Sequence, residues 1–262
     1  METWDHITND IVTIICTCMQ ETRTATPMRV NAETRLGDLR LDSYTHQKIH
    51  RNIARHCKVT VPKLLSFETV QDVVDYVLIT RNKYDQKELL MAFFRDGWSS
   101  IANVNNSIAN ELIEEINRKN PRRVLDIGCG NNFFKDKIHN LIGVDIVNPR
   151  ADVICDFIDF DAHGDKFDII LALGSINFGG RQHILSLLRR VKTILMDHGT
   201  VYMRVNPGVS WPQQPELIIY PWSENKILLH GADVGFALNG NLKFEHGPYG
   251  RRISFKYVHS LH

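Results

Sequence analysis

No stretch of the sequence approaches the roughly 20 consecutive apolar residues that a membrane-spanning helix needs, so we predict no membrane partner. The N-terminus, METWDHITND, is acidic and polar, which does not fit a secretory signal. An excess of one charge is also missing, because 31 Lys and Arg residues face 30 Asp and Glu residues. A formal charge of +1 gives no general attraction to nucleic acid, so we expect a substrate of another kind.

Cysteine is scarce and scattered. The five cysteines are odd in number, which argues for reduced thiols in the cytoplasm, and they lie at Cys16, Cys18, Cys57, Cys129 and Cys155. Cys16 and Cys18 form the only close pair, and no second pair or histidine cluster completes a zinc site. We therefore predict no metal. Internal repeats and low-complexity tracts are absent as well.

The 262 residues are enough for two domains, and the two halves of the chain differ in pattern. Residues 1–81 show helical spacing of apolar residues over 7–21 and 66–79, with Asp42-Ser43 opening another helix. This predicts a small four-helix bundle. Residues 82–121 read as a helical connector that includes the first helices of the next domain, which spans 122–262.

Apolar strands alternate with helices after residue 121. Strands are predicted over 123–128, 141–146, 151–157, 167–174 and 199–205, and their nearly continuous apolar runs indicate a parallel sheet covered on both faces. A helix is predicted from His183, with Gly199 as its C-cap. Alternation at Ile253, Phe255 and Tyr257 predicts a terminal antiparallel hairpin. The fold class is therefore α/β.

A glycine loop, Asp126-x-Gly128-x-Gly130, follows the first of these strands. It does not match a dinucleotide-binding loop, because Phe133 stands where the third glycine is needed, and no Gly-Lys-Ser/Thr follows for a Walker loop. A carboxylate at the strand tip repels phosphate and suits a cation such as an ammonium group. Asp145, at the end of the next strand, can accept both hydroxyls of a ribose.

The motifs VLDIGCGNN and IGVDI together resemble the class I S-adenosylmethionine-dependent methyltransferases, over about residues 122–258. The resemblance implies a Rossmann-like fold and this cofactor. It places the methionine part at Asp126, Gly128 and Gly130, the ribose at Asp145, the adenine at Asp156 and Phe157, and the sulfonium near Gly174 and Ser175. Asn132 departs from the third glycine of many members. The alternative is a Rossmann-like domain that has lost its ligand.

The catalytic residues are the hardest part of the site to predict from the sequence, because methyl transfer depends mainly on positioning the nucleophile. Asn177, Arg204 and Asn206 are candidates at or just past strand ends, although each is a good loop hydrogen-bonder too. Asn206-Pro207-Gly208 follows the fifth strand rather than the fourth, so we interpret it as a turn and not as the motif of DNA adenine methyltransferases. We expect a small-molecule acceptor, with protein or nucleic acid as the alternative.

Residues 35–77 resemble an acyl carrier protein, with Leu39-x-Leu41-Asp42-Ser43-Tyr44 matching the attachment motif. The resemblance implies a phosphopantetheine arm on Ser43; the alternative is that Ser43 only caps the helix. The helix at 44–58 departs from the family because it is basic, which favours an acidic protein partner. In the family, apolar residues facing the bundle stand at the positions of Gln47 and Arg51.

Taken together, these patterns predict a methyltransferase that acts on a small molecule, which the first domain could carry on Ser43. A rival hypothesis is a non-catalytic assembly module built from a carrier fold and a degenerate methyltransferase fold. The acidic residues kept at three strand ends favour the enzyme, and the basic helix favours the module. The sequence leaves the acceptor and the oligomeric state open.

Overall fold

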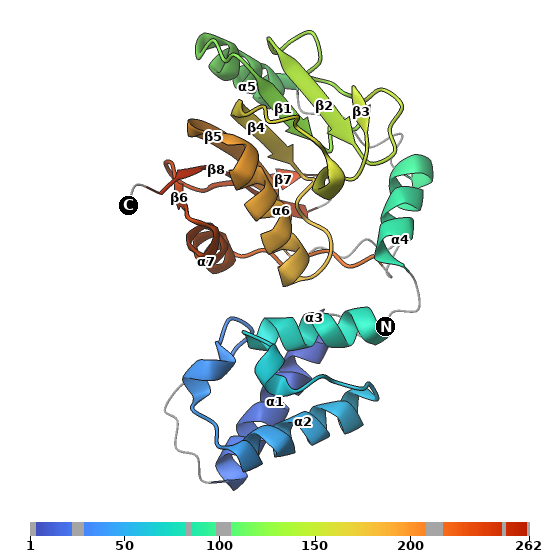
Figure 1. Cartoon of the computed structure of the whole chain (residues 1–262), viewed down its shortest axis with the longest axis vertical. Helices are drawn as coiled ribbons and strands as arrows, with labels where there is room; N and C mark the ends of the chain where they lie inside the picture. The colour runs from blue at the N-terminus through green and yellow to red at the C-terminus, as the bar shows by residue number, and fades with distance from the viewer. Residues whose placement is uncertain are drawn as a thin grey trace. The chain divides into compact units, whose positions relative to one another are not determined.

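The computed structural model describes residues 4–22, 29–81, 85–97, 106–207, 217–247 and 250–260. The chain divides into two compact units, drawn in Figure 1. The first comprises Met1–Asp85 with Gly180–Gln182, and the second comprises Gln86–Gly179 with His183–His262. Across the described residues, no helix is both long and apolar enough to cross a membrane.

The first unit is a helical bundle in which α1 (Trp4–Glu21) packs against α2 (Ser43–Cys57) and α3 (Val70–Arg81). Two short 3-10 helices, η1 (Leu36–Leu39) and η2 (Leu64–Ser66), complete its described part. The expected four helices are therefore not confirmed as such. The predicted apolar stripe of the last helix is fully buried and consists of Val70, Val73, Val74 and Val77.

Helix α2 begins with a side-chain cap, but the cap differs from the one considered for Ser43. Asp42 is the N-cap residue, and its Oδ1 accepts a 2.6 Å hydrogen bond from the backbone N–H of Thr45. This bond is the main cause that lowers the pKa of Asp42. Ser43 is the first helical residue and its side chain is exposed. Capping of α2 therefore does not account for Ser43.

The buried face of α2 carries Thr45, Ile49, Ile53 and Cys57. Gln47 and Arg51, at positions that face the bundle in carrier proteins, are exposed here, because this chain places isoleucines on its inward face.

Some of the basic side chains of α2 have partners within the unit. Lys48 Nζ lies 2.7 Å from Glu21 Oε2, and His56 Nε2 lies 3.0 Å from Asp10 Oδ2. The basic surface expected to face an acidic partner is reduced accordingly.

Replacing Asp42 with alanine is expected to destabilise the first unit by about 1 kcal/mol, because a backbone N–H of the first turn loses its acceptor. Ser43→Ala is the matched control and should change the free energy of unfolding by less than about 0.5 kcal/mol, since Ser43 is exposed. Chemical denaturation of the full chain, followed by helical circular dichroism, measures both. A larger loss for Ser43→Ala than for Asp42→Ala would contradict this assignment of the cap.

The second unit is built on one mixed sheet in the strand order β3-β2-β1-β4-β5-β8-β6, with β7 also paired to β8. The first five strands are parallel neighbours, while β6, β7 and β8 add antiparallel pairs. Their bounds are β1 Val124–Ile127, β2 Leu141–Asp145, β3 Val153–Ile154, β4 Phe167–Leu173, β5 Leu195–Val205, β6 Phe236–Leu238, β7 Lys243–Gly247 and β8 Gly250–His259. The predicted α/β class, parallel strands and terminal hairpin are confirmed.

Helices cover both faces of this sheet, as the apolar runs predict. Helices α6 (Arg181–Ile194) and α7 (Glu224–Val234) bury one face in the larger core cluster. On the other face, α5 (Asn106–Arg118) packs over Val124, Ile169 and Leu171. Helix α4 (Gln86–Ala92), the π-helix η3 (Phe93–Gly97) and the 3-10 helix η4 (Phe157–Asp159) complete the described elements.

The helix expected over 183–199 ends earlier than the sequence indicates. Helix α6 stops at Ile194, and β5 begins directly at Leu195, which pairs with Phe167 of β4. Gly199 is therefore not a C-cap: it lies inside β5, just before Thr200 resumes the pairing after a register shift. Pairing with β4 outweighs the helical periodicity that continues into this segment.

Candidate functional site

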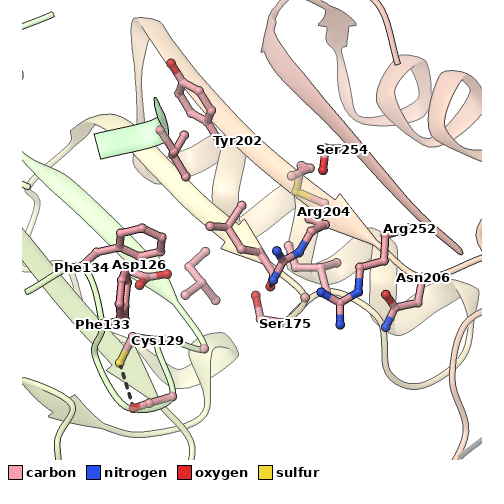
Figure 2. Close-up of a pocket in the computed structure, with 18 of the residues that line it drawn as sticks. Asp126, Cys129, Phe133, Phe134, Ser175, Tyr202, Arg204, Asn206, Arg252 and Ser254 are labelled. Atoms are coloured by element: carbon pink, nitrogen blue, oxygen red, sulfur yellow. Dashed lines mark hydrogen bonds between the residues drawn. The ribbon is translucent and has the colours of Figure 1, made fainter. Parts of the chain in front are cut away.

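A cavity of about 830 Å³ opens at the carboxyl ends of the parallel strands, where open α/β sheets place their ligands. Its volume falls within the roughly 300–1,000 Å³ range of small-molecule sites. Figure 2 shows the glycine-loop side at one end, with Asp126 and Cys129, and Arg204, Arg252 and Asn206 toward the other. All lining residues belong to the second unit.

The loop after β1 brings its backbone close to the cavity because two of its residues lack side chains. Gly128 and Gly130 have φ angles of +67° and +52°, in the left-handed region that glycine adopts without strain. A Cβ atom on Gly128 would lie 2.5 Å from Cβ of Ser175, so this position has no room for a side chain. At Gly130 nothing lies within 4 Å of an added Cβ, which leaves space for a ligand.

Asp126 is an acidic residue in a buried environment that disfavours its charged form. Its side chain is 3% exposed, and no residue in the described part of the chain forms a hydrogen bond with its carboxylate. Burial, followed by repulsion from Asp145, raises the pKa of Asp126 to about 7, although the positive charge of Arg204 acts in the opposite direction. A buried carboxylate of this kind is relieved by a cation that enters the cavity.

The Asp145 carboxylate accepts hydrogen bonds from backbone N–H groups of two loops, the one after β1 and the one after β2. Its Oδ2 accepts a 2.9 Å hydrogen bond from the N–H of Gly130, and its Oδ1 accepts bonds from the N–H groups of Val147 and Asn148 at 3.0 and 2.9 Å. A carboxylate has about four acceptor positions, so three are used. One remains for a ligand hydroxyl, fewer than the two that the sequence suggested.

The third acid, Asp156, lies at the start of η4 and lines the same cavity. Its Oδ1 caps η4 by accepting from the N–H of Ile158, and its Oδ2 lies 3.1 Å from Lys87 Nζ of α4. Phe157 follows with its ring 6% exposed and stacked near Phe160. The cavity therefore has an apolar aromatic side chain next to a polar group at this end.

The segment after β4 supplies both a buried hydroxyl and a rigid support. Ser175 Oγ is buried and has no hydrogen-bond partner among the described residues. Asn177 is fully buried: its Nδ2 donates to the carbonyl of Gly174 at 2.8 Å, and its Oδ1 accepts from the N–H of Asn206 at 2.9 Å. Asn177 thus ties the ends of β4 and β5 together, while Asn206 and Arg204 line the cavity.

These features fit the part of S-adenosylmethionine that each was expected to contact. The buried Asp126 carboxylate suits the ammonium group, and the backbone at Gly130 leaves room for a ligand. Among the described residues, the buried Ser175 hydroxyl has no hydrogen-bond partner. The structure brings the eight expected cofactor residues to one cavity: Asp126, Gly128, Gly130, Asp145, Asp156, Phe157, Gly174 and Ser175.

Sequence reasoning missed the charged residues of the terminal hairpin. Arg252 of β8 and Glu245 of β7 line the cavity, and Arg252 lies beside Arg204 (Figure 2). The alternation of apolar and polar residues along β8 could have indicated them. Because Ile253 and Phe255 face the core, Arg252 and Ser254 face the other side of the sheet.

No protein-family model matches the sequence, and a search of curated proteins by sequence finds no match. Solved structures do match. A 1,6-didemethyltoxoflavin-N1-methyltransferase from Burkholderia thailandensis, with bound 1,6-didemethyltoxoflavin and S-adenosylhomocysteine, has a TM-score of 0.52 at 16% identity, over 67% of this chain and 87% of that chain. Magnesium protoporphyrin IX methyltransferase (ChlM) from Synechocystis PCC 6803, with bound S-adenosylmethionine, has a TM-score of 0.52 at 12% identity, over 69% and 100% of the chains.

These neighbours are class I S-adenosylmethionine-dependent methyltransferases, and the likeness shows that the chain has their Rossmann-like fold with a mostly parallel mixed sheet. At this level of identity the likeness concerns the fold alone.

Proposed function

We propose that the second unit is an S-adenosylmethionine-dependent methyltransferase that acts on a small molecule. The observation that carries the proposal is Asp126, a buried carboxylate without a hydrogen-bond partner among the described residues, placed beside a glycine loop at the carboxyl edge of a methyltransferase fold. Such a group is costly for a protein that binds nothing there. The neighbours that act on small molecules, and a cavity in the size range of small-molecule sites, support a small acceptor.

The residues of the cavity would hold the cofactor along its length. Asp126 would bind the ammonium group beside the glycine loop, and Asp145 would accept from one ribose hydroxyl. Asp156 and Phe157 would hold the adenine. Lys87 already neutralises part of the charge on Asp156, so an uncharged ring suits this end of the cavity.

When bound, S-adenosylmethionine supplies a methyl group on a positively charged sulfur, which a nucleophile can take directly. The work left to the protein is positioning. Asn177 positions the loops after β4 and β5 and, being fully buried, does not line the cavity. Arg204 and Asn206, which do line it, are the candidates for contact with the acceptor.

Calorimetric titration with S-adenosylhomocysteine tests this function without knowledge of the acceptor. We expect saturable binding with a Kd below about 1 mM, which corresponds to roughly 4 kcal/mol of binding free energy. Absence of heat at about 1 mM ligand would contradict the cofactor assignment. It would favour the alternative of a degenerate methyltransferase fold kept as an assembly module.

We further propose that Ser43 carries a phosphopantetheine arm, to which the acceptor is tethered. The observation in favour is that Ser43 is exposed at the first residue of α2 and is spared from capping by Asp42. The positive end of the α2 dipole would stabilise the phosphodiester. Tyr44 beside it is 64% exposed, which offers a partner enzyme an aromatic contact.

Intact-mass analysis after incubation with coenzyme A and a broad-specificity phosphopantetheinyl transferase tests the loading. We expect one addition of about 340 Da, the mass of the arm, in the wild type and none in Ser43→Ala, whose fold should be unchanged because Ser43 is exposed. A wild type that gains no mass, or a Ser43→Ala variant that still gains it, would exclude Ser43 as the attachment site.

A further inference from the structure

The charged half of the cavity lies on the sheet face that α5 also packs against, because Arg204 is two residues from Tyr202 on the same face of β5. Along β8, Ile253, Phe255 and Tyr257 enter the core cluster on the opposite face. Strand geometry therefore turns Arg252 and Ser254 toward the cavity, and both line it. These side chains are far from the first unit in sequence and belong wholly to the second unit.

Arg204 of β5 faces the same space as Arg252. Arg204 pairs directly with Ser254 in the antiparallel register, which makes Arg252 its diagonal cross-strand neighbour. Figure 2 shows the two guanidinium groups pointing into the same end of the cavity, with Asn206 beside them. Burial, and then the positive charge of Arg252, lowers the pKa of Arg204, so the two charges act on each other.

The carboxylates of Glu245 and Asp126 offset part of the positive charge at Arg204, but among the described residues neither forms a hydrogen bond or ion pair with Arg204 or Arg252. Arg204 Nη2 donates to the carbonyl of Leu173 at 3.0 Å, a neutral partner. Within the described part of the chain, the Arg252 guanidinium makes no hydrogen bond or ion pair. Glu245 pairs with Arg252 in the β7–β8 register, yet its Oε1 accepts from Ser254 Oγ at 2.8 Å instead.

We propose that Arg204 and Arg252 form a binding site for an oxyanion, a carboxylate or a phosphate, carried by the methyl acceptor. Guanidinium groups match the planar or tetrahedral oxygens of such anions with paired N–H donors. The inference rests on the proposed function, since it names the acceptor class of the same cavity. A cationic sulfonium near Ser175 would add a third positive charge, which an anionic acceptor offsets and a cationic acceptor does not.

Two neutral groups complete the site. Ser175 Oγ, which has no partner among the described residues, lines the cavity between the glycine loop and the β5 end. The position of Asn206 is fixed because its N–H donates to the buried Asn177 side chain. Both can donate hydrogen bonds to an acceptor oxygen that the arginines hold.

The test measures anion binding to the full chain by calorimetry at low ionic strength, with inorganic phosphate and with malonate as the probes. The variants are Arg252→Gln and Arg251→Gln. Arg251 is the matched control because it is the adjacent residue of β8, faces away from the cavity, and lies over the Phe244 ring at 4.5 Å. Both substitutions remove one positive charge. Sodium chloride at equal ionic strength serves as the salt control.

We expect the wild type and Arg251→Gln to bind at least one probe, and Arg252→Gln to bind it about tenfold more weakly or worse. The probe that binds more tightly shows whether the site prefers a phosphate or a carboxylate. Equal binding by all three proteins, or none by the wild type, would overturn the site. Titration of the same samples with S-adenosylhomocysteine distinguishes failure of the anion site from failure of the proposed function. If S-adenosylhomocysteine binds and the anions do not, only the anion site is contradicted. If the anions bind and S-adenosylhomocysteine does not, only the proposed function is contradicted.

A second measurement on the wild type avoids any folding effect of the substitutions. Phenylglyoxal modifies accessible arginines, and peptide mass mapping resolves neighbouring sites. The more effective anion should slow modification of Arg252 several-fold and leave Arg251 unaffected. Equal protection of both residues would contradict a site at Arg252.

Discussion

Replacing Asp126 with asparagine is expected to stabilise the protein at pH 8 and to weaken its binding of S-adenosylhomocysteine at the same pH. Asparagine keeps the shape of the side chain and removes the buried charge. The stability effect follows from the pKa of Asp126, which burial raises from 3.8 to about 7. A difference of about three pKa units corresponds to about 4 kcal/mol of unfolding free energy.

The direction of this pH dependence is fixed by which state binds the proton more tightly. The folded state holds the Asp126 proton up to about pH 7, whereas the unfolded state releases it near pH 3.8. The favourable contribution to folding is therefore complete below about pH 4 and is lost as the pH rises to about 7. Wild type and Asp126→Asn should differ little at pH 4 and most above pH 7.

Urea denaturation of both proteins at pH 4.5, 6 and 8 measures this difference. A gap that widens with pH, with the variant more stable, is the expected result. A variant that is less stable than the wild type at pH 8 would mean that an internal partner compensates the Asp126 charge. Calorimetry on the same samples should give binding of S-adenosylhomocysteine at least about tenfold weaker for the variant, because a charged hydrogen-bond partner is lost.

Replacing Asp145 with alanine is expected to cost both stability and ligand binding. Its carboxylate is 7% exposed and accepts from the N–H groups of Gly130, Val147 and Asn148. An N–H left without an acceptor costs about 1–3 kcal/mol when buried, and these three are only half-buried, so we expect a total loss of about 1–3 kcal/mol. Binding should fall further than one lost ribose hydrogen bond explains, because the glycine loop loses its anchor.

Asp168→Ala is the matched control for Asp145→Ala. Asp168 also accepts from two backbone N–H groups, those of Arg122 and Arg123 at 2.8 and 2.9 Å, but it stands at the amino end of β4, away from the cavity. This variant should lose some stability and keep its affinity for S-adenosylhomocysteine. If Asp145→Ala retained wild-type affinity, Asp145 would not belong to the ligand site.

Much of the fold and of the cofactor end of the cavity could be predicted from local patterns. Apolar runs such as VLDI and FDIILAL are buried on both faces, which the sequence expresses directly. Asp126 and Asp145 lie near the carboxyl ends of β1 and β2, and Gly128 follows β1 directly. These strands are parallel neighbours, so their carboxyl ends meet at one edge of the sheet whatever the conformation of the loops. The meeting of these residues at that edge can therefore be predicted without knowing the long-range contacts of the fold.

The acceptor end could not be predicted in the same way. Arg204 and Arg252 are 48 positions apart, and only the register of β5 against β8 makes them neighbours. The end of α6 was misplaced for a similar reason, since Leu195 continues a helical stripe but pairs with Phe167 of β4. Register depends on the whole sheet and leaves little trace in one sequence.

The central claim is that Asp126 recognises the amino-acid end of an adenosyl ligand. The most direct measurement compares the affinities of S-adenosylhomocysteine and 5′-methylthioadenosine, which keeps the adenosine and the thioether sulfur but lacks the amino-acid end. At pH 8 the wild type should bind S-adenosylhomocysteine at least about tenfold more tightly, and Asp126→Asn should lose most of that preference. A wild type that binds neither ligand, or an Asp126→Asn variant that keeps the full preference, would contradict the claim.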